Sequence, residues 1–150
     1  MNYKLLHQTA ATIAFATIAS FLLSTLTAEF IGDHELIAVV KKAIVYGLSI
    51  LIICIPLTVI SGKRLAAFYP NNLYVKAKTK RMKWIGINAV IFLIPLAITL
   101  NYFAQNNQLD MSFYSLQALE IVCGLINIFL FIKMFADGRQ IDSKVLALKN

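Results

Sequence analysis

The chain has 150 residues, of which 59% are hydrophobic and only 14% are charged, and its formal net charge is +7. An average soluble domain is about half apolar and about a quarter charged, so this composition excludes an ordinary soluble domain. A basic protein raises nucleic acid as a partner, but here most lysines and arginines flank apolar stretches. We therefore expect a membrane protein with no nucleic-acid partner, whose basic residues set its orientation.

Four apolar stretches are long enough to cross a bilayer, which takes about 20 mostly apolar residues. They cover about 8–28, 36–62, 84–104 and 112–132. Asp33 is a good N-cap for the second span, and Glu120 is the one acid inside the fourth. The sequence predicts an all-α fold, an integral membrane antiparallel four-helix bundle that forms a single transmembrane domain over 1–150.

The connections between the spans differ in charge. The second connection, 63–83, holds seven basic residues and no acid, and the tail, 133–150, adds four more. With Lys4, this places twelve of the 14 basic residues on one side, because only Lys41 and Lys42 lie on the other. Cytoplasmic loops gather Lys and Arg, so we expect both termini to be cytoplasmic. The bilayer is then the first partner, with anionic lipid headgroups at the basic loop 63–83.

Glu120 is the most informative residue of the chain. It lies eight residues into the fourth span, about 12 Å below its start. A charge at that depth is costly and calls for a partner. Lys41 and Lys42 lie at a similar depth in the second span, so we expect an ion pair of Glu120 with one of them while the other extends outward. A structural salt bridge and a proton-linked or ligand-binding carboxylate are both open interpretations.

Further polar residues are expected at the outer end of the spans, near Glu120. We predict that they form an outer polar pocket, which consists of Glu29, Asp33, His34, Glu35, Asn101 and Gln117. His34 with adjacent carboxylates has ligand types that suit zinc or iron. The alternative is a solvated helix N-terminus whose acids favour the helix dipole.

The first span opens with Lys4-Leu5-Leu6-His7 and an alanine-rich helix. Over about a dozen residues this resembles the start of membrane b-type cytochromes, which implies His7 as a haem b ligand. The only other histidine, His34, is 27 residues away, about 40 Å along a helix. A haem would therefore need His7 with Met82 or Met134, or His7 from two protomers. An interfacial histidine without a ligand is the alternative.

Two patterns inside the spans predict helix packing. One face of the first span carries small residues at steps of three and four, which are Thr9, Thr12, Ala16, Ser20, Ser24 and Thr27. Such a face lets helices approach closely in lipid, and a water-lined path is the alternative. Asn88 and Asn127 lie at comparable depths in the third and fourth spans, so we expect a hydrogen bond between them.

The sequence contains no recognisable enzyme template, because it has no HExxH, P-loop or GxGxxG motif. This absence favours a protein that is not an enzyme. The segment from Glu29 to Lys42, the run from Phe113 to Glu120 and the dipeptide Asp137-Gly138 resemble a group of small four-helix membrane proteins of bacteria. That group has no assigned activity. The resemblance implies a bacterial inner membrane and nothing about chemistry.

Three functional hypotheses remain. The first is a non-enzymatic membrane protein that binds a small ligand or a partner, either a second copy in a homo-oligomer or another membrane protein. The second is an electron-transfer protein with haem b at His7 or a metal at His34. The third is a proton-coupled transporter, or a subunit of one, that uses Glu120.

Overall fold

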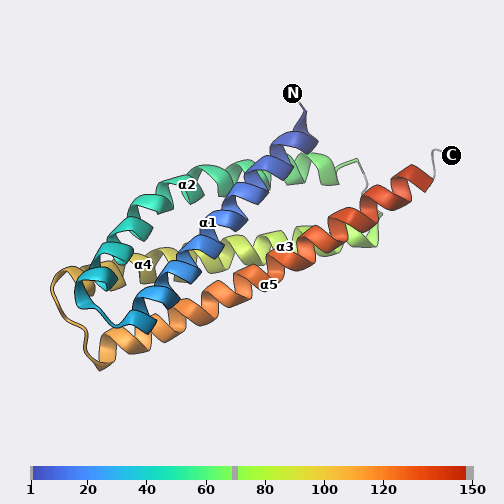
Figure 1. The fold of residues 1–150 in the computed structure, drawn as a ribbon. Helices are drawn as coiled ribbons and strands as arrows, with labels where there is room; N and C mark the ends of the chain where they lie inside the picture. The colour runs from blue at the N-terminus through green and yellow to red at the C-terminus, as the bar shows by residue number, and fades with distance from the viewer. Residues whose placement is uncertain (1, 69–70, 148–150) are drawn as a thin grey trace.

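The structure is a computed structural model that describes residues 2–68 and 71–147, with side chains as far as Arg139. Within these ranges every regular element is helical: α1 (Tyr3–Ile31), α2 (His34–Ala66), α3 (Leu73–Asn88), the π-helix η1 (Ala89–Leu93), α4 (Ile94–Gln105) and α5 (Met111–Ala147). Because α3, η1 and α4 follow one another without a break, the chain forms four long helical segments (Figure 1). Each of the four is long and apolar enough to cross a membrane.

The ends of the segments gather at two poles of the elongated molecule. The start of α1, the end of α2, the start of α3 and the end of α5 lie toward one pole (Figure 1). The α1–α2 and α4–α5 connections lie at the other. The first pole carries the basic residues between Lys63 and Lys83, and the second carries Asp33 and Asp110, so the two poles differ in charge.

Short polar side chains define the starts of the helices. Asp33 accepts a hydrogen bond from the backbone N–H of Glu35, which confirms its predicted role as N-cap of α2. Asn72 accepts from the N–H groups of Tyr74 and Val75, and thereby starts α3. Between α1 and α2, Gly32 adopts a left-handed conformation (φ 72°) that ends α1 and lets the chain reverse within two residues.

The basic connection is shorter than the sequence predicted. We expected a loop over 63–83 and a tail over 133–150, but α2 continues to Ala66, α3 begins at Leu73, and α5 continues to Ala147. Lys and Arg favour helix, and the Asn72 cap gives α3 an early start. Charge marks where a helix leaves the apolar layer, but it does not mark where the helix ends.

A π-helical turn interrupts the third segment just before Pro95. Proline has no N–H to donate to the carbonyl four residues earlier, and its ring crowds that carbonyl. The backbone N–H of Ile94 bonds to the oxygen of Ala89, five residues back, so the turn that precedes the proline is widened. Such single π-turns are how α-helices absorb a local insertion without ending.

The surface of the molecule is more apolar than that of a soluble protein, and several polar side chains lie in its interior. Large apolar side chains such as Leu23, Ile53 and Phe129 are exposed, whereas Lys41, Gln117 and Asn127 are buried. This arrangement is expected where the surrounding medium is hydrocarbon, because only the interior offers hydrogen-bond partners.

Two predicted packing features have different outcomes. Asn88 Nδ2 donates to Asn127 Oδ1 at 2.9 Å and to the carbonyl of Cys123 at 2.8 Å, so the interhelical hydrogen bond is confirmed. The small-residue face of α1 does not pack in the interior of the chain, because all six of its residues are exposed, and its role in helix contacts stays a prediction. The face that packs inward is the adjacent one, with Ala10, Ala14 and Ile18, because it combines small and aliphatic side chains that fill the core.

Candidate functional site

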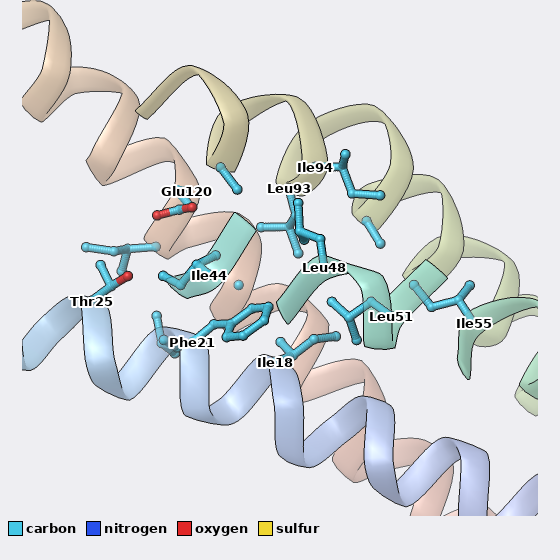
Figure 2. A pocket seen from close by; sticks show the side chains of 15 residues that line it. Ile18, Phe21, Thr25, Ile44, Leu48, Leu51, Ile55, Leu93, Ile94 and Glu120 are labelled. Atoms are coloured by element: carbon cyan, nitrogen blue, oxygen red, sulfur yellow. The ribbon is translucent and has the colours of Figure 1, made fainter. Parts of the chain in front are cut away.

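The core contains a cavity of about 50 Å³ that is lined by α1, α2, α5 and the third segment. Its walls are aliphatic and aromatic over most of their length, with Ile18, Leu48 and Leu51 among them (Figure 2). Thr25 and Glu120 supply polar atoms at one end, while Ile55 lies at the other (Figure 2). The cavity has room for a few water molecules at most, and its apolar walls favour an empty state.

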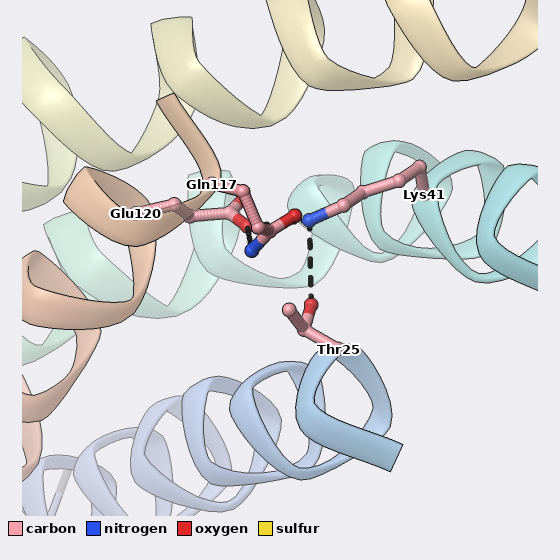
Figure 3. Close-up of polar contacts among 4 residues, drawn as sticks. All are labelled: Thr25, Lys41, Gln117 and Glu120. Atoms are coloured by element: carbon pink, nitrogen blue, oxygen red, sulfur yellow. Dashed lines mark hydrogen bonds and ion pairs between the residues drawn. The ribbon is translucent and has the colours of Figure 1, made fainter. Parts of the chain in front are cut away.

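A buried ion pair lies at the polar end of this cavity. Lys41 Nζ of α2 lies 2.6 Å from Glu120 Oε2 of α5 (Figure 3). The Lys41 side chain is 1% exposed and that of Glu120 is 12% exposed. The sequence predicted a pair of Glu120 with either lysine, and the structure has it with Lys41, whereas Lys42 is exposed. Adjacent helix positions are about 100° apart, so only one of the two can face inward.

Two neutral side chains complete the hydrogen bonds of the pair. Lys41 Nζ also donates to Thr25 Oγ1 of α1 at 3.4 Å, and Gln117 Nε2 donates to Glu120 Oε2 at 3.1 Å (Figure 3). Three helices therefore meet at one ammonium and one carboxylate. Thr25 was absent from the sequence-based prediction; its signal was its position one helical turn before Glu29, on the same face of α1.

Glu29 adds a second carboxylate near Lys41. It is half-buried on the last turn of α1, within electrostatic range of both Lys41 and Glu120. Its Oε1 atom is buried and has no hydrogen-bond partner, and the same holds for Oε1 of Gln117. We call Thr25, Glu29, Lys41, Gln117 and Glu120 the polar centre. Two glutamates and one lysine give it a formal charge of −1, with two acceptor oxygens unused.

The predicted outer polar pocket forms only in part. Of its six residues, Glu29 and Gln117 join the polar centre, whereas Asp33, His34 and Glu35 are exposed around the start of α2. Asn101 is half-buried and accepts a hydrogen bond from Gln105 Nε2 at 3.4 Å, one turn further along α4. Within 2–68 and 71–139, no three His, Cys, Asp or Glu side chains converge as metal ligands. The geometry thus gives no support to a metal site at His34.

His7 is buried at the opposite pole of the molecule. The residue is 6% exposed, and the ring Nδ1 donates to the carbonyl of Thr58 at 3.1 Å, with Ser61 Oγ at 3.3 Å. The cavity between Met82 and Met134, the two methionines considered as haem ligands, has a volume of about 20 Å³, which fits about one water. This cavity is too small to hold a porphyrin between the two methionines, and Nδ1 of His7 is engaged with the Thr58 carbonyl. A haem between the His7 side chains of two protomers stays a prediction.

Comparison of the chain with known protein families, with curated proteins and with solved structures yields no match. The polar centre is therefore interpreted from its own geometry.

Proposed function

We propose that this protein is a non-enzymatic, multi-pass protein of a bacterial inner membrane that binds a small cation, in the first place a proton, at the polar centre. Its four segments form an antiparallel membrane bundle with both termini in the cytoplasm. The observation that carries the proposal is the pair of buried, unpartnered acceptor atoms, Glu29 Oε1 and Gln117 Oε1, beside a site of formal charge −1.

The charge of the polar centre favours uptake of one positive charge. Lys41 neutralises Glu120 through a contact of 2.6 Å and a shared hydrogen-bond network. Glu29 is a second carboxylate near the same lysine, so the net charge of the group is −1. A net charge is unfavourable at a partly buried site at the end of a membrane bundle, and a single bound cation would remove it. Sites of this kind are common on proton and ion pathways.

The size and chemistry of the site favour a proton over a larger ligand. The adjoining cavity of about 50 Å³ has apolar walls, whereas pockets for drug-sized ligands typically measure about 300–1,000 Å³. A proton needs no cavity, and it converts a carboxylate oxygen from an acceptor into a donor. One proton on Glu29 would remove the net charge and turn an oxygen of this carboxylate into a hydrogen-bond donor.

Access to the centre is one-sided. Glu29 is half-buried near the α1–α2 connection, among the exposed residues Asp33 and Glu35. On the opposite side, the apolar cavity separates Glu120 from the remaining polar groups of the core. A proton can therefore exchange with the outer surface without crossing the bundle. Coupling to transport would require a second state in which the apolar barrier is hydrated.

We expect Glu29→Gln to abolish proton uptake at the polar centre while the Lys41–Glu120 pair stays intact, because the amide leaves the site neutral without a proton. Infrared spectra of the purified protein across a pH series measure this, since a protonated carboxyl in an apolar site has its own C=O stretching band. The wild-type protein should show one such band that titrates, and Glu29→Gln should lack it.

The matched control is Glu35→Gln, which removes an exposed carboxylate from the first turn of α2, across the α1–α2 connection, and should leave the band unchanged. Circular dichroism of each variant checks the helical fold. A band of the same size in wild type and Glu29→Gln would refute the assignment to Glu29. The absence of a titrating carboxyl band from the folded wild-type protein would refute proton binding altogether.

The orientation has its own test, which uses single cysteines at the two poles. We expect Asn71→Cys to react with a membrane-impermeant maleimide only after the cells are opened, and Asn106→Cys to react in intact spheroplasts. The native thiols, Cys54 and Cys123, are buried and give a low background. The reverse labelling pattern would contradict the cytoplasmic assignment of the termini.

A further inference from the structure

A large groove lies between the end of α2 and the first half of the third segment, at the basic pole. Its volume is about 890 Å³, and it is open to the surroundings. Three of its basic residues, Lys76, Lys80 and Lys83, follow each other at steps of four and three along α3, and Lys63 of α2 also lines the groove. We call these four residues the lysine rim. All four are exposed.

The described residues that line the groove include four lysines and no acidic residue. The ion pairs of Lys41 with Glu120 and of Arg81 with Asp137 do not involve a rim lysine. Four ammonium groups around one groove attract an anion. Basic pockets between membrane helices on the cytoplasmic side bind phosphate-containing lipid headgroups for this reason.

The deep part of the groove is apolar. Val59 of α2 and Ile87 and Ile91 of the third segment line it beyond the lysine rim. Ile91 lies eight residues past Lys83, which is about 12 Å along the helix, close to half of the about 30 Å hydrocarbon core. Trp84, next to Lys83, is 55% exposed, and exposed tryptophans mark the headgroup level of a bilayer. The basic part thus lies at headgroup depth and the apolar part at acyl-chain depth.

From this arrangement we infer that the groove is a binding site for one acidic phospholipid. The phosphate contacts the lysine rim, and an acyl chain lies against Val59, Ile87 and Ile91. Phosphatidylglycerol and cardiolipin fit this description, whereas a zwitterionic lipid of the same chain length lacks the net negative charge. This site is separate from the polar centre and does not depend on proton binding there.

Native mass spectrometry of the delipidated protein, with phosphatidylglycerol, cardiolipin or phosphatidylethanolamine of matched chains added back, tests the inference. We expect one acidic lipid to be retained, and phosphatidylethanolamine to be lost at the same concentration. The rim variant Lys76→Gln/Lys80→Gln/Lys83→Gln should weaken retention about tenfold or more. The control Arg64→Gln/Lys133→Gln/Arg139→Gln removes the same charge from exposed positions outside the groove and should retain the lipid.

A second variant tests the acyl-chain part without a change of charge. Gly86 lines the groove, and a Cβ added there meets no atom within 4 Å, so this position has room for the first atom of a side chain. Gly86→Leu extends that side chain to take up part of the groove. We expect Gly86→Leu to reduce retention although all four lysines remain. Equal loss in the rim and control variants would refute the site in favour of diffuse surface charge. Full retention by Gly86→Leu, or equal retention of phosphatidylethanolamine, would refute it as well.

Discussion

Lys41→Met lowers the free energy of unfolding by about 3–5 kcal/mol, the cost expected when one partner of a buried ion pair is removed. Methionine keeps most of the volume of Lys41, so the loss is electrostatic rather than a loss of packing. Glu120 then remains only 12% exposed, without its cation and with Glu29 nearby. Chemical or thermal unfolding in detergent, followed by circular dichroism, measures the effect.

The control for this prediction is the neutral double variant Lys41→Met/Glu120→Gln. Glutamine keeps an acceptor for Gln117 Nε2, and no charge is left in the interior. Replacement of a whole buried pair is often neutral, so we expect the double variant to recover most of the stability that Lys41→Met loses. If the double variant is the least stable of the set, the stability losses of the two substitutions add. That result would show that the two side chains do not act as a pair. Lys42→Met, at an exposed position, should be close to neutral.

The ion pair was predictable from the sequence because membrane spans convert residue number into depth. Glu120 and Lys41 each lie about eight residues from the same pole, and a charge at that depth must have a partner. The same argument paired Asn88 with Asn127, whose contact measures 2.9 Å. Depth alone did not distinguish Lys41 from Lys42 as the partner of Glu120. The rotation of α2 about its axis is what turns Lys41 toward Glu120. That rotation depends on packing over the whole helix.

Other features were outside the reach of the sequence pattern. Asp33, His34 and Glu35 share a pole with Glu29, but residues at the same depth can point to different sides, and these three point outward. The small-residue face of α1 has the correct helical spacing, yet the chain packs the adjacent alanine face instead. The spacing of small residues identifies one face of a helix, but it does not identify the helix that packs against that face. The groove of the lysine rim likewise required the relative placement of α2 and α3.

Two glycines that face α1 should respond in opposite ways to the same substitution. A Cβ on Gly47 of α2 would lie 2.5 Å from Cζ of Phe21, closer than atoms can approach. A Cβ on Gly124 of α5 would meet only Leu22 Cδ1, at 3.6 Å, beside the cavity that Gly124 helps to line. Alanine gains about 1 kcal/mol over glycine inside a helix at either position. Packing therefore determines the difference between the two variants.

We expect Gly124→Ala to raise the melting temperature, because it adds helix propensity and a methyl group in ordinary contact. Gly47→Ala should lower it, because overpacking typically costs about 1–3 kcal/mol and here displaces an aromatic ring. Phe21→Leu removes the ring atoms that conflict with the new methyl group, so Gly47→Ala should cost less in a Phe21→Leu background than in the wild type. If Gly47→Ala proves as stabilising as Gly124→Ala, then α1 and α2 are not held as closely as the contact at Gly47 requires.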